Sequence, residues 1–249
     1  MLAIIGGSGL SRLSSLEIVR REVVRTPYGE PSGALTFGRL GDTDVVFLAR
    51  HGYGHTIPPH LVNYRANIWA LKHAKVSEIV SVASVGGIRP EFGPGVLVVP
   101  DQILDYTWGR VSTFFEGGDE PVHHIDFTHP YDGSLRERIL SAAATIGETV
   151  VDGGVYATTQ GPRLETAAEV NRLERDGADL IGMTGMPEAA LARELGLRYA
   201  AINVVANHAA GRASSENAIE FDSIESVLQE AMVRVRHVLE TICAQQGPR

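Results

Sequence analysis

The chain has 249 residues, 44% of them hydrophobic, and carries a formal net charge of −8 at pH 7. This hydrophobic content can fill a sizeable core, whereas the acidic balance argues against a general nucleic-acid binder, whose phosphate contacts need a basic face. The single Cys243 excludes an internal disulfide framework. Because the chain has no apolar run of about 18 residues and no basic opening segment, we expect a cytoplasmic protein without membrane contact.

Short β-branched runs alternate with helical segments along the chain. The run Leu2–Ile5 predicts a first strand that leads directly into glycines. Further strands are predicted at Val45–Leu48, Glu78–Val82, Val96–Val99, Val151–Ala157, Leu180–Gly182 and Tyr199–Val205. Several of these runs are apolar on both faces, which is typical of strands buried between helical layers.

Two helices are predicted in the first part of the chain. The proline pair at 58–59 can occupy a first turn, where no backbone donor is missed. Apolar residues then recur at helical spacing, at Leu61, Tyr64, Ile68 and Leu71. The same spacing predicts a second helix through Leu135, Ile139, Ala142 and Ile146.

Two more helices are predicted toward the end of the chain. Pro187 is expected to begin a short helix that ends near Gly196. Asp222 and Glu225 have the spacing of a capping box and precede a long apolar stripe between residues 224 and 242. Since no repeat or linker divides the chain and 117–121 is expected to be a loop, residues 1–249 predict one α/β domain. We expect a central, mixed and curved β-sheet flanked by helices.

A glycine-rich turn, Gly6-Gly7-Ser8-Gly9, follows the first predicted strand. Such a turn lets backbone N–H groups approach an anion, and the hydroxyl of Ser8 adds a donor. A dinucleotide fingerprint would need a third glycine where Arg12 stands, so a dehydrogenase is not expected. A plain structural turn remains the alternative.

Arg50-His51-Gly52 follows the strand predicted at Val45–Leu48. Ligands collect at strand ends in α/β sheets, and an arginine there can hold two oxygens of an anion. The commoner alternative is an arginine paired with a carboxylate.

The histidines at 51, 55 and 60 raise the question of a metal site. An i, i+4 pair suits zinc only on a helix, and Gly52 and Gly54 make a helix improbable there. No other metal-ligand motif accompanies them. We therefore expect no metal.

The most specific stretch is TTQGPRLET at 158–166, followed by GMTGMPE at 182–188. Together with the turns at 6–9 and 50–52, it resembles the trimeric purine nucleoside phosphorylases, and nearest the branch that handles 5′-methylthio nucleosides. The resemblance runs from residue 2 to about residue 240. It implies a homotrimer that takes a nucleoside and inorganic phosphate and needs no cofactor.

The resemblance also assigns site residues. Those implied to bind phosphate are Ser8, Arg50, His51, Ser84 and Thr184. Those implied to contact the sugar or base are Met183, Leu164, Gly86 and, from a neighbouring subunit, His124. Met183 could instead be a core residue. Ile219 and Phe221 could line a slot for the 5′ substituent or simply pack the last helix. Ala83 stands where the methylthioadenosine branch has a threonine.

Two positions are expected to select the base. Relatives that recognise 6-oxopurines have the glutamate found here as Glu165, and adenine-reading relatives have aspartates where this chain has Asn207 and Ala209. A carboxylate can accept from N1–H of hypoxanthine, and an asparagine amide can donate to O6 and accept from a protonating N7. Adenine reverses both edges, so we expect a 6-oxopurine.

The expected reaction is phosphorolysis of a 5′-methylthio nucleoside of hypoxanthine. Alternatives within the resemblance are phosphorolysis of inosine and guanosine, or of methylthioadenosine. A nucleosidase that uses water and a non-catalytic purine sensor on the same fold also remain open.

Overall fold

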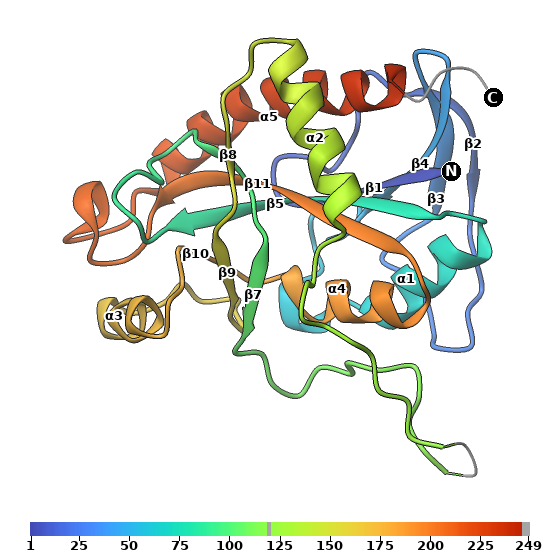
Figure 1. The fold of residues 1–249 in the computed structure, drawn as a ribbon, viewed down its shortest axis with the longest axis horizontal. Coiled ribbons are helices and arrows are strands. Elements are labelled where there is room, and N and C mark those ends of the chain that lie inside the picture. Colours follow the sequence, from blue (N-terminus) through green and yellow to red (C-terminus); the bar gives the residue numbers. More distant parts are fainter. Residues whose placement is uncertain (119–120, 246–249) are drawn as a thin grey trace.

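The computed structural model describes residues 1–118 and 121–245, which fold around a branched β-sheet (Figure 1). The part of the predicted loop at 119–120 lies outside the described residues. The strands are β1 (Leu2–Gly6), β2 (Glu17–Glu22), β3 (Leu35–Leu40), β4 (Thr43–Ala49), β5 (Glu78–Gly87), β6 (Leu97–Val99), β7 (Gln102–Asp105), β8 (Val150–Asp152), β9 (Val155–Thr158), β10 (Leu180–Gly182) and β11 (Arg198–His208). The helices are α1 (Tyr64–His73), α2 (Gly133–Thr145), α3 (Ala167–Arg175), α4 (Gly185–Glu194) and α5 (Phe221–Ala244), with 3₁₀ turns η1 (Pro59–Leu61) and η2 (Ala213–Ser215).

The sheet is mixed, as expected. One path runs β2-β3-β4-β1-β5-β10-β9-β7, and β11 branches from β5 to reach β6 and β8. Strand β1 pairs in parallel with β4 and β5, and β11 pairs in parallel with β5. The carboxyl ends of β1, β4, β5 and β11 therefore point the same way, so the residues that follow them gather at one edge.

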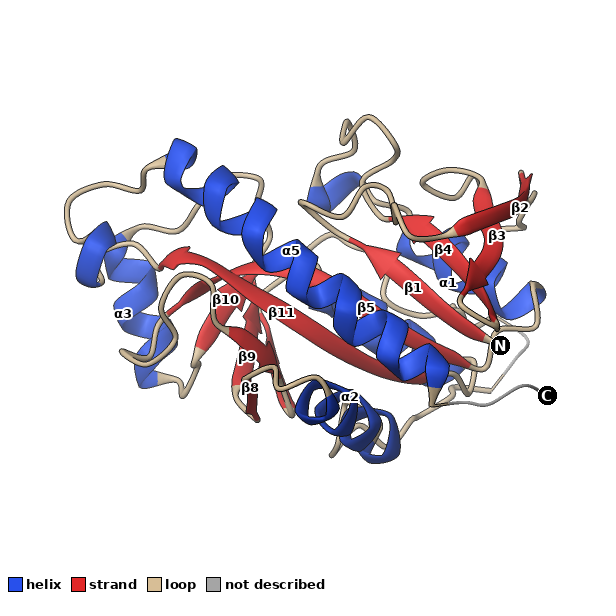
Figure 2. Cartoon of the chain, turned by 90° about the horizontal axis from the view of Figure 1, so that it is seen from above, coloured by secondary structure: helices blue, strands red, loops and turns tan. Residues whose placement is uncertain are grey.

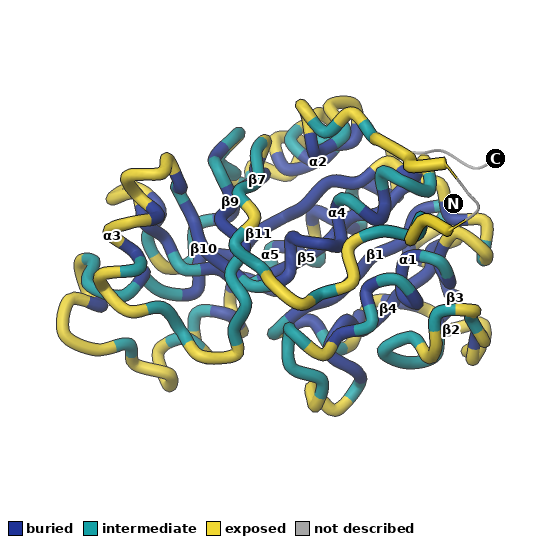
Figure 3. Tube along the Cα trace, turned by 90° about the horizontal axis from the view of Figure 1, so that it is seen from below, coloured by how far each residue is buried: buried dark blue, intermediate teal, exposed yellow. Residues whose placement is uncertain are grey.

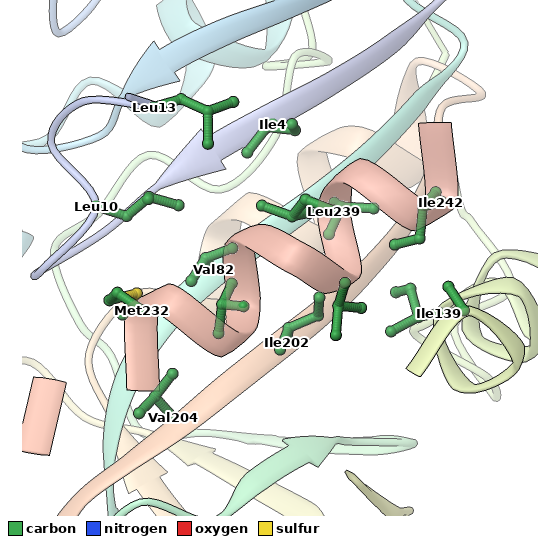
Figure 4. Close-up of a cluster of buried hydrophobic side chains, with 14 of the residues drawn as sticks. Ile4, Leu10, Leu13, Val82, Ile139, Ile202, Val204, Met232, Leu239 and Ile242 are labelled. Atoms are coloured by element: carbon green, nitrogen blue, oxygen red, sulfur yellow. The ribbon is translucent and has the colours of Figure 1, made fainter. Parts of the chain in front are cut away.

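Two apolar layers cover the central strands. Helices α2 and α5 lie on one face (Figure 2), where Ile4, Val82 and Ile202 meet Met232 and Leu239 (Figure 4). Helices α1 and α4 cover the other face through a second cluster of buried side chains. Strands β5 and β11 are buried along most of their length (Figure 3), which explains their continuous apolar runs.

Several predicted boundaries were wrong. The run Val151–Ala157 forms two strands, β8 and β9, because Gly153 and Gly154 have φ of 95° and 124° and turn the backbone between them. The proline pair at 58–59 does not open α1. It leads into η1, and α1 begins at Tyr64 with Asn63 as its N-cap. Leu61 is consequently 66% exposed.

The expected capping box at Asp222 and Glu225 was also wrong, since α5 begins at Phe221 and its N-cap Glu220 makes no side-chain cap. A true capping box is formed at the start of α3, where Thr166 and Glu169 bond to each other's backbone N–H groups. The regular part of α4 begins at Pro187, as predicted, after the non-helical Met186.

Candidate functional site

A cavity of about 710 Å³ opens where the carboxyl ends of the central strands meet. All but one of the residues predicted for the site line it: Gly86, Ser8, Arg50, His51, Ser84, Leu164, Glu165, Met183, Thr184, Asn207, Ile219 and Phe221. Residues more than 200 positions apart in the chain thus share one hollow. The exception is His124, which is exposed in the segment between β7 and α2. The part of the cavity near Arg50, where the sequence predicts phosphate, is called the phosphate end, and the part near Glu165, where it predicts the base, is called the base end.

At the phosphate end, Arg50 is 0% exposed and pairs with Glu188 on α4. Its Nε donates to one carboxylate oxygen at 2.7 Å and its Nη2 donates to the other at 2.8 Å. Nη2 also donates to the Ser81 hydroxyl at 2.6 Å, and Nη1 donates to the Val82 carbonyl at 3.0 Å. Burial opposes the charged guanidinium, but attraction to Glu188 outweighs it and raises the pKa of Arg50.

This pairing changes the expected role of Arg50. The edge of its guanidinium that was expected to hold two oxygens of an anion holds the Glu188 carboxylate instead. Four of the five guanidinium N–H groups are used, so one N–H on Nη1 remains to face a ligand. The alternative of an arginine paired with a carboxylate is therefore confirmed. Arg50 also lines the cavity, and its contact with an anion stays a prediction.

His51 lies beside Arg50 and is 7% exposed. Its Nδ1 lies 2.8 Å from the Ile57 carbonyl, which can only accept, so Nδ1 carries the proton. Burial, followed by the neighbouring Arg50 charge, lowers the pKa of His51 to about 4. The ring is thus neutral near pH 7, and its Nε2 is an acceptor that could take a proton from a phosphate hydroxyl.

Hydroxyl groups complete the phosphate end. Ser8 follows β1, Ser84 lies in β5, and Thr184 is the N-cap of α4, where its side chain does not cap the helix. The Ser8 hydroxyl lies 3.5 Å from Nε2 of His55, at the limit of a hydrogen bond. Thr184 is buried, and its hydroxyl, which does not cap the helix, is available to a ligand.

The base end carries Glu165, in the loop between β9 and α3, and Asn207, near the carboxyl end of β11. The Thr159 hydroxyl donates to Glu165 at 2.5 Å, and burial raises the pKa of Glu165. A register shift in β11 between Val205 and Asn207 lets Ala206 and Asn207 both reach the cavity. Asn207 Nδ2 donates to the His208 carbonyl at 2.6 Å. Ala209 also lines this end, so no second carboxylate stands there.

Sequence reasoning missed Arg110, which holds the base end together from behind. Its Nη1 donates to the carbonyls of Met183 at 2.8 Å and Met186 at 2.7 Å. Its Nη2 donates to the carbonyls of Thr159 at 3.2 Å and Gln160 at 2.9 Å. One side chain therefore joins the ends of β9 and β10. It lies in a long loop without apolar periodicity, so no sequence signal pointed to it. Glu188 was also missed, although an acidic residue among apolar ones in α4 was a signal.

The middle and mouth of the cavity are more apolar. Met183 packs against Gly161, where an added Cβ would lie 2.4 Å from the Met183 sulfur. Ile219 and Phe221 line the mouth together with Ile224 and Leu228. Phe221 is 68% exposed, so its ring covers the opening only loosely in the single chain.

Among the described residues, no group of three or more His, Cys, Asp or Glu side chains is placed to hold a metal ion. The rings of His51 and His55 lie 4.7 Å apart and are tilted. Within that same part of the chain, no helix is both long and apolar enough to cross a membrane.

Comparisons with known proteins identify the family of the chain. A family model described as "Phosphorylase superfamily" matches residues 1–244. A protein of Pseudomonas syringae pv. tomato named "Probable S-methyl-5'-thioinosine phosphorylase" is 52% identical over 240 residues, covering 96% of this chain and 97% of that one. A namesake in Xanthomonas campestris pv. campestris is 56% identical over 210 residues, covering 84% of each chain.

Two further relatives have names that state a different nucleoside substrate. A "6-oxopurine nucleoside phosphorylase" of Pyrococcus furiosus is 47% identical over 215 residues, covering 84% of this chain and 80% of that one. The solved structure of methylthioadenosine phosphorylase from Schistosoma mansoni in complex with adenine superposes with a TM-score of 0.94 at 33% identity, covering 100% of this chain and 92% of that one.

Proposed function

The chain belongs to the phosphorylase superfamily, and from this premise we propose that it catalyses phosphorolysis of S-methyl-5′-thioinosine. The products are hypoxanthine and 5-methylthioribose 1-phosphate. The observation that carries the proposal is that Glu165 and Asn207 share one cavity with Arg50 and His51. A base-recognising pair and an anion site are thus presented to one ligand-sized space.

The base end suits a 6-oxopurine. Ionised Glu165 accepts a hydrogen bond from N1–H, and the Asn207 amide can donate to O6 while its oxygen accepts from a protonating N7. With adenine, the N6 amino group and the unprotonated N1 would face groups of the wrong polarity. A site built on such polar matching can discriminate by about 10⁴ or more.

The phosphate end supplies the nucleophile. Ser8, His51, Ser84 and Thr184, with the remaining N–H of Arg50, hold phosphate beneath C1′ of the sugar. A phosphate oxygen forms the bond to C1′ as the C1′–N9 bond breaks, and the electron pair of that bond passes to the purine. The ribosyl centre gains positive charge, which phosphate offsets. Asn207 stabilises the charge that builds on the purine, an interaction that strengthens toward the transition state.

The mouth favours a methylthio group over a hydroxyl at the sugar's 5′ end. Ile219, Phe221 and Leu228 offer apolar contact there. Inosine, which carries the same base with a 5′-hydroxyl, is the second candidate substrate. The 6-oxopurine relative in Pyrococcus furiosus supports that alternative.

We further propose a cytoplasmic homotrimer without a resident cofactor. In such an assembly the exposed His124 of one subunit would lie near the 5′ end of its neighbour's substrate. The loose cover that Phe221 gives the mouth of the single chain is consistent with completion by a neighbour.

The test is to supply S-methyl-5′-thioinosine, inosine and methylthioadenosine in parallel, with and without phosphate, and to measure base release. We expect hypoxanthine release only with phosphate and the highest kcat/KM on the methylthio nucleoside of hypoxanthine. Equal release without phosphate would show a nucleosidase. Tight binding without any base release would show a sensor.

A further inference from the structure

A buried layer of polar side chains lies directly behind the phosphate end. Glu188 is 0% exposed and Tyr199 is 3% exposed, and neither lines the cavity. They come from α4 and from the start of β11, elements that meet beneath the floor of the site. Both are linked to Arg50, the one Arg or Lys side chain among the described residues that lines the cavity.

Every contact of the Glu188 carboxylate fixes its position. Oε2 accepts from Nε of Arg50 at 2.7 Å. Oε1 accepts from Nη2 of Arg50 at 2.8 Å, from the Ser81 hydroxyl at 2.9 Å and from the Tyr199 hydroxyl at 2.9 Å. Because Arg50 is held along its Nε and Nη2 edge, the plane of its guanidinium has no freedom to rotate.

Fixing the plane of the guanidinium also fixes the position of Nη1 of Arg50. A Cβ added to Gly7 would lie 2.8 Å from this atom, so Nη1 lies directly beneath the Gly7-Ser8 turn of the cavity wall. One of its N–H groups donates to the Val82 carbonyl, which leaves the other as the donor available to a ligand. Any rotation of the guanidinium would move this donor away from the cavity.

Stability alone gives little reason to retain such a pair, since well-packed apolar replacements of buried ion pairs are often neutral or stabilising. A requirement for one N–H at a defined place does give a reason. We propose that Glu188 and Tyr199 are positioning residues for the phosphate co-substrate, acting through the buried guanidinium of Arg50. This inference rests on the proposed function, in that phosphate must bind beside Arg50.

The chain offers a matched control for Tyr199. Tyr131 is also 3% exposed and stacks on Tyr199, with ring centroids 6.0 Å apart. Within the described residues, its hydroxyl has no hydrogen-bond partner. Replacing either tyrosine by phenylalanine deletes one buried hydroxyl from the same ring stack, but only Tyr199→Phe removes a bond to Glu188.

The experiment measures the KM for phosphate and for S-methyl-5′-thioinosine in the full-length wild type, Tyr199→Phe, Ser81→Ala and Tyr131→Phe, with a melting temperature for each. We expect Tyr199→Phe and Ser81→Ala to raise the phosphate KM by about 3- to 10-fold. A rise of this size corresponds to the loss of part of a hydrogen bond to a charged group. The nucleoside KM should stay within about twofold, and Tyr131→Phe should match wild type in both constants.

Three results would overturn the inference: a lower melting temperature with an unchanged phosphate KM, an equal rise in both KM values, or the same effect in Tyr131→Phe. A wild-type enzyme that releases base without phosphate would instead remove the proposed function, and this inference with it.

Discussion

The two ends of the cavity are built in different ways. At the phosphate end, Arg50 and Glu188 are fully buried and held by four hydrogen bonds that the guanidinium donates. At the base end, Glu165 lies in the loop between β9 and α3 and Asn207 lies near the end of β11. Both are half-buried, and each has one short side-chain hydrogen bond. The Arg50–Glu188 pair is therefore part of the core, whereas Glu165 and Asn207 lie at its margin.

The two ends of the cavity should therefore tolerate substitutions differently. Arg50 and Glu188 cannot be altered without disturbing the packing of β5, β11 and α4. A residue at the base end can be exchanged with little effect on stability, so specificity can be altered there while the phosphate chemistry stays the same.

The largest expected effect on stability comes from breaking the buried pair. Glu188→Gln leaves the Arg50 charge without its partner and should lower the free energy of unfolding by about 3–5 kcal/mol. Denaturant unfolding measures it. Asp42→Asn is the control, since Asp42 pairs with Arg39 at 3.5 Å on the surface and its loss should cost under about 1 kcal/mol. Equal losses in the two variants would contradict the contrast between core and surface.

At the base end the expected effect falls on rate instead. Asn207→Ala should lower kcat/KM for the nucleoside by about 10²- to 10³-fold, because a donor to developing charge is lost. The melting temperature should change little. Asn217→Ala, at an exposed position outside the cavity, is the control. A fall in kcat/KM of less than about threefold would show that Asn207 does not stabilise the transition state.

Arg110→Lys tests how the base end is held. Lysine cannot reach four carbonyls at once, so the segments after β9 and β10 should loosen and the nucleoside KM should rise by about tenfold. The phosphate KM should stay near its wild-type value. Steady-state kinetics with each substrate varied in turn gives both constants, and a rise confined to phosphate would contradict this role.

The smallest expected effect is on pH dependence. Since burial raises the pKa of Glu165, the acid limb of kcat/KM for the nucleoside should lie above the ordinary range of a glutamate. Only the ionised form accepts from N1–H, so activity falls as pH falls through that pKa. In Glu165→Gln this limb should vanish.

The stability that Glu165 contributes to the fold changes with pH in the opposite direction to activity. A carboxyl group whose pKa is raised in the folded state contributes stability at low pH and loses it as pH rises through the folded pKa. Glu165→Gln should therefore melt higher than wild type at pH 8 and show less difference at pH 4. A wild-type acid limb retained in Glu165→Gln would assign that limb to another group.

The sequence predicted the elements that are buried and apolar throughout. Strands β1, β4, β5, β10 and β11 were anticipated because both of their faces pack against other layers. Strand β2 was missed because all six of its residues are exposed, and α3 because only Val170 and Leu173 are buried in it. Local propensity is weak where tertiary packing decides the structure.

The sequence also predicted which residues gather in one cavity, whereas the roles of these residues stay predictions. Many of the cavity residues lie at or just after the carboxyl ends of strands, and parallel strands bring such positions together. The hydrogen-bond partners of the Arg50 guanidinium could not be predicted. Glu188 lies 138 positions away and was interpreted only as part of a helix start. The role of Arg110 could not be predicted either, because its partners are backbone carbonyls, which have no sequence signature.

The central claim is that Glu165 and Asn207 select a 6-oxopurine. It is tested most directly by the ratio of kcat/KM for S-methyl-5′-thioinosine to that for methylthioadenosine, in the wild type and in the Glu165→Ser, Asn207→Asp double variant. We predict a wild-type ratio of about 10⁴ or more and a fall of at least about 100-fold in the double variant, with some gain on the adenine nucleoside. A double variant that keeps the wild-type preference would contradict the account.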